Sequence, residues 1–133
     1  MVMKKCCGVL RIAVRMIVLG LLLSGSANAM TVTVNASGGG DSTRIQEAID
    51  NASAGDTILV SNGIYYENVN VTKQLTLRGI GNPVVDAGGS GSAITLSANG
   101  IALGGFAATG SGYYYYSPEA GIMVTSNNNI PAK

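Results

Sequence analysis

The sequence predicts an all-β fold in which short strands stack in successive coils, and three observations point to this class. Apolar and polar residues alternate over stretches of about four to six residues, which small-residue turns separate. The apolar side of these stretches is almost wholly aliphatic, since the 133 residues include 6 Tyr, 1 Phe and no Trp. Similar stretches recur after 26 residues, from Leu75 to Ile101, and after 28 residues, from Ile94 to Ile122. An antiparallel sandwich usually buries aromatic rings between its sheets, so this pattern favours a right-handed parallel β-helix (solenoid) with a short N-terminal capping helix.

The first 29 residues form an expected signal peptide. A basic start leads into the apolar run 16–23 and then into Ala27-Asn28-Ala29, which is the order of segments that a signal peptidase recognises. We therefore expect cleavage after Ala29 and a β-helix domain over residues 30–133. The apolar run is too short for a membrane-spanning helix, which needs roughly 20 apolar residues. Because Cys6 and Cys7 precede the apolar run, cleavage would leave a chain without disulfides or thiolate chemistry.

The exported part is expected to start with a strand and a helix. Residues 31–34 alternate Thr and Val, which predicts a strand. Thr43 and Gln46 fit a capping box at the start of the helix, and Gly55 fits its stop. We expect the helix to cover the open end of the coils, where strand edges and apolar side chains would otherwise be exposed. Four apolar residues share one face of this helix: Ile45, Ala48, Ile49 and Ala52.

From Asp56 onward the alternation has the period of two that is typical of strands. Polar residues such as Thr76 and Arg78 are expected to point outward. The runs 57–60 and 84–85 are shorter apolar stretches with strand character. The expected inward residues come in pairs: Val69 and Val71, Leu75 and Leu77, Ile94 and Leu96, Ile122 and Val124.

Composition and charge exclude several classes of function. The chain contains no His, which removes imidazole catalysis and His-ligated metal sites. The formal net charge is +1 at pH 7, but half of the basic residues lie in the expected signal peptide, so the rest of the chain is acidic and unsuited to nucleic acid. The glycine run 38–40 lacks the Lys and Ser/Thr that follow in a phosphate-binding loop. We expect no cofactor and no metal.

Exposed aromatic residues are the main candidates for a contact surface. Tyr113, Tyr114, Tyr115 and Tyr116 follow one another in a loop that Pro118 closes. Four consecutive rings cannot all point to one side of a strand, so some are exposed and suited to sugars or protein partners. Arg78 could hold a uronate carboxylate. The alternative is structural, with the rings lying back over the neighbouring coil and Arg78 solvated.

The acidic residues give no assigned catalytic site. Glu67 and Asp86 could face one groove, but a two-carboxylate site needs a separation of about 5 to 10 Å that the sequence does not establish. Three Asn-x-Ser/Thr triplets, at Asn35, Asn51 and Asn70, are N-glycosylation acceptors in a cell that has the machinery. The acids beside the helix are expected to have structural roles: Asp41, Asp50 and Asp56.

Six runs of residues resemble the opening of pectin-lyase-like right-handed β-helix proteins. They are 43–49 (TRIQEAI), 54–60 (AGDTILV), 63–69 (GIYYENV), 75–79 (LTLRG), 82–88 (NPVVDAG) and 104–106 (GGF). The likeness covers residues 31–128 and is greatest to NosD-type periplasmic and archaeal surface β-helix proteins. It implies the β-helix fold and a location in the periplasm, on the cell surface or outside the cell. The opening also resembles that of pectin methylesterases, but in such enzymes the catalytic residues lie on later coils, and none matches a position here.

We therefore expect an exported structural or carbohydrate-binding module, with polysaccharide or surface glycans as partners and no membrane contact beyond the export signal. A fragment of a polysaccharide-active enzyme, of the pectate lyase or pectin esterase type, is an open alternative. A NosD-like accessory role in copper-enzyme maturation is another, with Met30 and Met123 as the remaining soft ligands. The run 121–129 resembles a coil in the middle of an array, so we expect a chain truncated at its C-terminus, with further coils of a longer β-helix as its partner.

Overall fold

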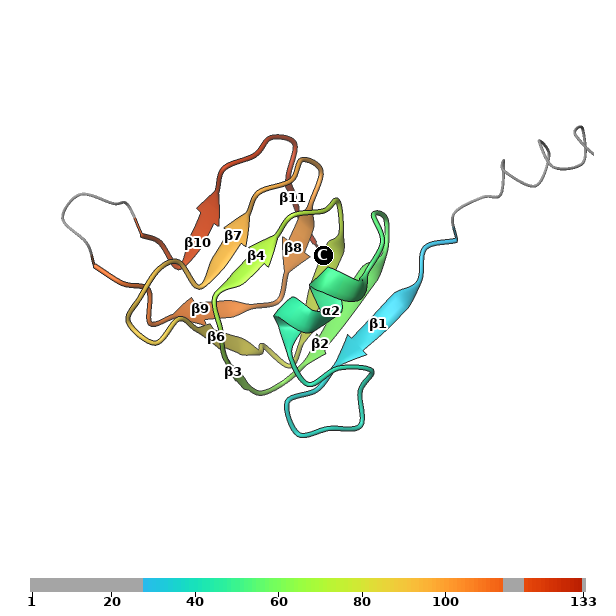
Figure 1. Ribbon diagram of the computed structural model, residues 1–133, viewed down its shortest axis with the longest axis horizontal. Coiled ribbons are helices and arrows are strands. Elements are labelled where there is room, and N and C mark those ends of the chain that lie inside the picture. Colours follow the sequence, from blue (N-terminus) through green and yellow to red (C-terminus); the bar gives the residue numbers. More distant parts are fainter. Residues whose placement is uncertain (1–27, 114–118, 133) are drawn as a thin grey trace, which may run out of the picture.

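The computed structural model describes residues 28–113 and 119–132, and strands dominate it (Figure 1). The expected signal peptide therefore lies outside the described residues, except for Asn28 and Ala29. Within the described residues the single helix, α2, spans Ile45–Asn51. The strands are β1 (Thr31–Val34), β2 (Thr57–Ser61), β3 (Ile64–Tyr66), β4 (Val69–Val71), β5 (Thr76–Ile80), β6 (Val84–Asp86), β7 (Ile94–Leu96), β8 (Ala102–Gly104), β9 (Ala107–Thr109), β10 (Ile122–Val124) and β11 (Ile130–Pro131).

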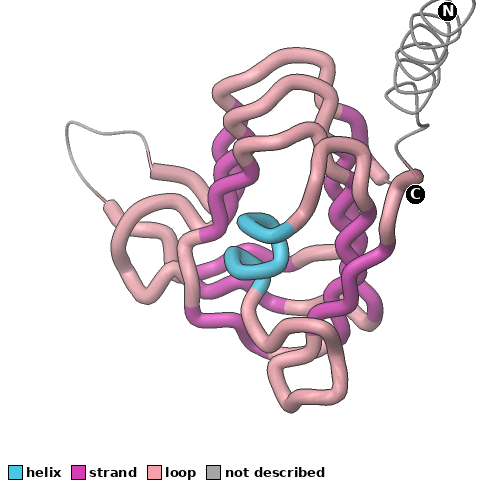
Figure 2. Tube along the Cα trace, turned by 45° about the vertical axis from the view of Figure 1, so that its right-hand side comes forward, coloured by secondary structure: helices cyan, strands magenta, loops and turns pink. Residues whose placement is uncertain are grey.

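The strands form three parallel sheets, which the chain visits in a repeating order. The main sheet contains β1, β2, β5, β8 and β11, the second sheet contains β3, β6 and β9, and the third contains β4, β7 and β10. From β2 to β11 the chain passes from the main sheet to the second, then to the third, and back to the main sheet. We call each such passage through the three sheets a round. Figure 2 shows the strands of successive rounds lying over one another. The all-β class and the parallel pairing agree with the sequence prediction.

The strand register agrees with both repeat intervals found in the sequence. Ile122 pairs with Ile94 in the third sheet. In the main sheet the N–H of Ala102 donates to the carbonyl of Leu75 at 3.0 Å, which places Leu75 and Ile101 at the same point of successive rounds. Because side chains alternate along a strand, parallel register places each inward residue next to the inward residue of the neighbouring round.

The number of residues in a round varies along the chain, although the strands pair in parallel throughout. Thr57 pairs with Thr76, which lies 19 positions further along the chain. Ala102 pairs with Ile130, which lies 28 positions further along. The turns between strands absorb this difference.

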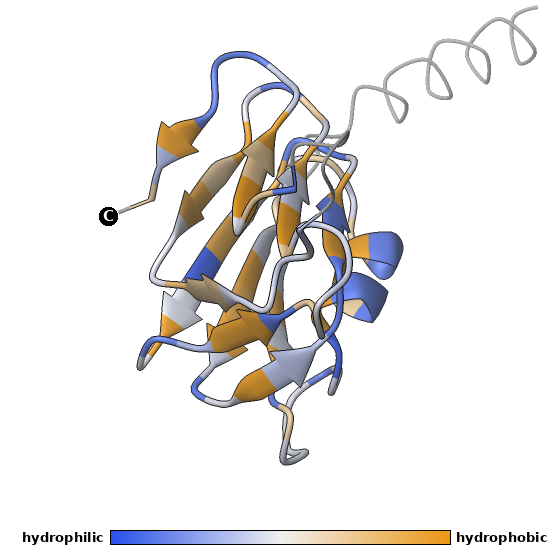
Figure 3. Ribbon diagram, turned by 90° about the vertical axis from the view of Figure 1, so that its left-hand side faces the viewer, coloured by the Kyte–Doolittle hydropathy of each residue, from blue (hydrophilic) through white to orange (hydrophobic). Residues whose placement is uncertain are grey.

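Aliphatic side chains fill the space between the three sheets. The inward residues predicted for β4, β5 and β7 are buried, as are Ile58, Val60 and Val85. Each such side chain contributes about 1.5–3 kcal/mol when it is fully buried. The aromatic ring of Tyr65 is also buried, and its hydroxyl donates to the carbonyl of Ser61 at 2.9 Å. Figure 3 shows the apolar residues that line the strands.

Helix α2 covers one end of this core, as the sequence predicts. Ile45, Ala48 and Ile49 are buried, and so is Ala52 just beyond the helix. The helix contacts β1, β2 and β4, and Figure 3 shows its outer side as hydrophilic. A helix of 7 residues is too short to be stable alone in water, so contacts with the strands must hold it. Among the described residues, none lies in a helix with the length and apolar character needed to cross a bilayer.

The predicted capping box is wrong. The helix follows Arg44, which has extended backbone angles, and no side chain at that position caps it. Gln46 bonds elsewhere: its Oε1 accepts from the N–H of Asn70 at 2.8 Å, and its Nε2 donates to Asp50 at 2.9 Å. The rule fails because it considers only neighbours in sequence, whereas Glu67, in the turn between β3 and β4, accepts from the N–H groups at the start of this helix.

Two other features differ from the sequence prediction. Ile122 and Val124 pair with inward residues of β7 but stay 43% and 54% exposed, because β10 is the edge strand of the third sheet opposite β4, the edge strand on which α2 packs. Strands β3, β8, β9 and β11 were not predicted, because their residues lack a clear alternation of apolar and polar side chains.

Glycine permits a close approach between two rounds. A Cβ at Gly79 would overlap the carbonyl oxygen of Gly105, so the backbones meet there without room for a side chain. At Gly121, by contrast, a Cβ would meet Ala108 Cβ at 3.5 Å, which is an ordinary contact.

Candidate functional site

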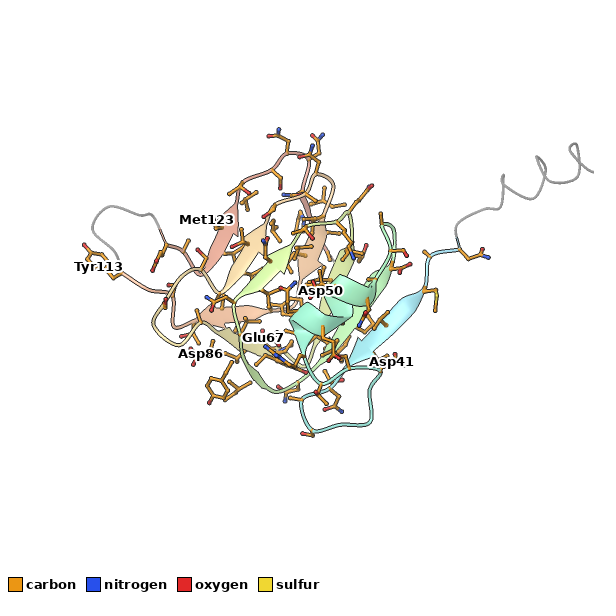
Figure 4. The ribbon with its side chains drawn as sticks, in the orientation of Figure 1. Asp41, Asp50, Glu67, Asp86, Tyr113 and Met123 are labelled. Atoms are coloured by element: carbon orange, nitrogen blue, oxygen red, sulfur yellow. The ribbon has the colours of Figure 1, made fainter. Side chains whose placement is uncertain are left out.

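A buried carboxylate holds the N-terminal end of α2. Glu67 lies between β3 and β4 and is 9% exposed (Figure 4). Its Oε1 accepts from the N–H of Ile45 at 2.8 Å, and its Oε2 accepts from the N–H of Gln46 at 3.0 Å. The first N–H groups of a helix have no partner within the helix, and a negative charge there also faces the positive end of the helix dipole. Glu67 therefore caps the helix from 22 positions away in the sequence.

An ammonium group holds the other end of α2. Lys73, in the turn between β4 and β5, donates to the carbonyls of Asp50 and Ala52 at 2.8 Å and to that of Ile49 at 3.1 Å. A cation at this end satisfies carbonyls that lack helical partners and faces the negative end of the dipole. Glu67 and Lys73 together form what we call the helix clamp.

Two aspartates tie the segments around the helix to the start of the main sheet. Asp41 Oδ2 accepts from the N–H of Thr33 at 2.8 Å and from its hydroxyl at 2.7 Å. Asp56 accepts from the N–H of Met30 and from that of Ser53, each at 2.8 Å. The N–H of Thr33 beside Asp41, and that of Met30 beside Asp56, lower the pKa of these carboxyl groups. These bonds agree with the structural roles expected for the two residues.

Side-chain amides at and beside β4 link neighbouring rounds. Asn70 Oδ1 accepts from the hydroxyl of Ser97 on the next round at 2.6 Å. Asn68 donates to the carbonyls of Ser90 and Ser92 at 2.7 and 2.9 Å. These amides are engaged within the fold, so they serve to hold one round to the next.

The residues predicted to contact sugars come from different parts of the surface. Tyr113 is 90% exposed in the loop between β9 and β10 (Figure 4), whereas Tyr114, Tyr115 and Tyr116 lie outside the described residues. Arg78 is exposed on β5 of the main sheet, in register with Leu59 and Gly104.

A second exposed ring was not predicted from the sequence. Tyr66 is 75% exposed on β3, in register with Asp86 of β6. Adjacent residues of a strand point to opposite faces, so the pair Tyr65-Tyr66 carried the signal that one ring is exposed.

Glu67 and Asp86 have different partners. The Oδ1 of Asp86 accepts from the N–H of Gly88 at 2.9 Å, whereas both oxygens of Glu67 bind the start of α2. Figure 4 labels both residues. Across residues 28–113 and 119–132, no group of three or more His, Cys, Asp or Glu side chains is placed to hold a metal ion.

The three asparagines of the glycosylation triplets differ in their surroundings. Asn51 is exposed at the C-terminal end of α2. Asn35 is partly buried, and its Oδ1 accepts from the N–H of Ser37 at 3.0 Å. Asn70 is exposed, but its side chain is bonded to Ser97.

The fold and these contacts define an all-β protein of parallel sheets whose buried carboxylates bind backbone N–H groups. Among curated proteins, the chain is similar to a cell surface glycoprotein of Methanothermus fervidus, with 38% identity over 91 residues. The match covers 66% of this chain but 15% of that glycoprotein, so the chain spans a small part of its relative's length. No family model matches the sequence, and no solved structure matches it either.

Proposed function

We propose that this chain is a structural module of a cell-surface protein, built as a right-handed parallel β-helix of the NosD type that α2 caps. The observation that carries the proposal is the repeating order of the three sheets, in which strands of successive rounds pair in parallel. Crossover connections between parallel strands are right-handed in about 98% of cases, which supports the handedness. The use of Asp41, Asp56 and Glu67 to bind backbone groups suits a structural role.

The proposed location rests on the relative's name and on the expected signal peptide. The similar protein of Methanothermus fervidus is named a cell surface glycoprotein. Residues 1–29 have the order of segments of an export signal. Protease treatment of intact cells that express the whole chain tests this location: a surface module is digested, whereas a cytosolic chain is protected until the cells are broken.

Disulfide formation between chosen strands tests the architecture. In a background with Cys6→Ser and Cys7→Ser, the pair Thr57→Cys and Thr76→Cys joins neighbouring strands. Such strands lie about 4.7–4.9 Å apart, within the range that a disulfide spans. The matched control, Thr57→Cys with Ala102→Cys, is two strands apart and should not oxidise. Cross-linking in the control, or its failure in the first pair, would contradict the stacking.

We also propose that this module contacts carbohydrate through its exposed rings. Tyr113 and Tyr66 are 90% and 75% exposed, and exposed rings pack well on sugar faces. Binding to a glycan array should weaken with Tyr113→Ala and with Tyr66→Ala, but not with Ile80→Ala, which removes another exposed apolar side chain. Equal binding by all four proteins would remove the rings from the proposal. Unsaturated products, reducing ends or methanol released from pectin would replace it with the enzyme interpretation.

Asn51 is the N-glycosylation acceptor that we propose, because it is exposed and lies at the end of a helix. In a host with N-glycosylation, Asn51→Gln should remove one glycan from the intact mass. Asn70→Gln is the matched control, since the Asn70 side chain is hydrogen-bonded to Ser97. This variant should carry the same number of glycans as the wild-type protein.

A further inference from the structure

The register between β1 and β2 brings the backbone nitrogen of Met30 to the carboxylate of Asp56. Thr31 pairs with Thr57, so Met30 and Asp56, the residues that precede the two strands, lie beside each other. Asp56 Oδ1 accepts from the Met30 N–H at 2.8 Å, and the N–H of Thr57 donates to the Met30 carbonyl at 2.8 Å. Met30 is therefore held on both sides of its Cα.

The carboxylate of Asp56 is shielded from solvent. The residue is 6% exposed, and its second oxygen accepts from the N–H of Ser53 at 2.8 Å. The positive charge of Lys73 also lowers the pKa of Asp56, but the ammonium group donates its hydrogen bonds to three carbonyls at the end of α2. A buried negative charge is stabilised by a cation in direct contact, and the nitrogen of Met30 stands where such a cation would be.

We propose that export processing supplies this cation, because cleavage of the Ala29–Met30 bond turns the Met30 nitrogen into an α-ammonium that forms an ion pair with Asp56. The inference rests on the export signal of the proposed function. The host's signal peptidase adds water across the C–N bond; Ala29 departs with a carboxylate on the signal peptide, and Met30 keeps the amine, which takes up a proton. Asn28 and Ala29 are exposed, so the bond that breaks is not packed into the fold.

The ammonium suits this position better than the amide does. An α-amino group has an ordinary pKa of about 7.7–8.0 and is mostly charged at pH 7. It carries three hydrogens where the amide carries one, and charge-assisted hydrogen bonds are shorter and stronger than neutral ones. Met30 as a residue is 66% exposed, so ammonium hydrogens that do not reach Asp56 can donate to water. The ion pair locks β1, an edge strand of the main sheet, once the signal peptide has gone.

Competitive labelling with acetic anhydride tests the ion pair in the processed protein. The whole chain is expressed in an exporting host, the extracytoplasmic protein is recovered, and its first residue is identified by sequencing. The pKa of the Met30 amine is then measured from the pH dependence of its labelling, in the folded protein and in urea. Asp56 raises this pKa and Lys73 opposes the rise. We expect a net increase of about one unit over the value in urea, which makes labelling roughly tenfold slower near pH 7.

The variants separate the carboxylate from the rest of the fold. Asp56→Asn keeps one acceptor oxygen but removes the charge and leaves Lys73 in place, so the amine's pKa should fall to its value in urea or below it. Asp41→Asn is the matched control, because its carboxylate binds Thr33 and should leave the amine unchanged. The comparison of folded and unfolded wild-type protein needs no variant, so the test holds even where Asp56→Asn does not fold.

The outcomes distinguish this inference from the proposed function. An exported protein that begins at Met30 but shows the same amine pKa folded and in urea overturns the ion pair alone. An exported protein that begins at another residue also overturns it and leaves the surface location standing. A chain that stays in the cytosol with residues 1–29 attached overturns the proposed function and the ion pair together.

Discussion

Replacing Glu67 by glutamine removes the charge that holds the N-terminal end of α2. Glutamine has one acceptor oxygen where the carboxylate has two, so one of the N–H groups of Ile45 and Gln46 loses its partner. A buried donor without an acceptor costs about 1–3 kcal/mol, and the lost charge at the helix dipole adds about 0.3–1 kcal/mol. We expect the free energy of unfolding to fall by about 1–4 kcal/mol. At about 4–8 °C per kcal/mol, this lowers Tm by several degrees at least.

Urea unfolding followed by far-UV circular dichroism measures this loss, and amide hydrogen exchange at Ile45 and Gln46 locates it. The matched control is Glu47→Gln on the same helix, whose carboxylate accepts from the exposed hydroxyl of Ser42 at 2.9 Å. Glu47 is exposed in the first turn of α2, so the control should change the free energy of unfolding by less than about 1 kcal/mol. Equal stability of the two variants, with unchanged exchange at Ile45 and Gln46, would refute the role of Glu67 as the helix cap.

Three further predictions concern the other end of the clamp, the packing of the rounds and the response to acid. Lys73→Met keeps the aliphatic stem but leaves carbonyls of α2 without a donor, so the urea midpoint should fall by the equivalent of about 1–3 kcal/mol; an unchanged midpoint would contradict this. Gly79→Ala should cost about 1–3 kcal/mol because its Cβ meets backbone, whereas Gly121→Ala should stay within about 0.5 kcal/mol in the same thermal melts. Asp41 and Asp56 have a lower pKa in the folded chain than the ordinary 3.8, so their stabilisation is complete above about pH 4 and is lost as the pH falls through the folded pKa. Urea midpoints from pH 7 to pH 2 should show this loss, and it should shrink when both are replaced by Asn.

The sequence predicts those parts of the fold that depend on repeated local patterns. The pairs Val69 and Val71 or Ile94 and Leu96 are buried because a strand alternates its side chains, and two positions are enough to show the alternation. The apolar face of α2 is buried because Ile45, Ala48 and Ile49 recur at the helical spacing of three to four residues, which places them on one side of the helix. The interval from Ile94 to Ile122 predicted a pairing because equal patterns on successive rounds must share a register.

The contacts that hold α2 are not visible in the sequence. Glu67 and Lys73 resemble any surface acid and base until the fold places them at the two ends of one helix. The capping box misled because Thr43 and Gln46 fit a local rule, and the competing acceptor comes from a strand turn 22 positions away. Tyr66 is not part of a long run of rings such as 113–116, but its alternation with buried Tyr65 predicts its exposure.

The unequal rounds have a consequence for how such a protein can diversify. The stretch from Thr57 to its partner Thr76 and the longer stretch from Ala102 to Ile130 give the same parallel pairing. Insertions and deletions in the turns therefore leave the strands and their inward residues undisturbed, since longer surface loops cost little chain entropy. Evolution can lengthen one turn, recruit new polar or aromatic residues there and alter what the surface presents, while selection on the aliphatic interior proceeds separately. A scaffold of this kind suits an outer surface, where contacts with the surroundings change faster than the requirement to stay folded.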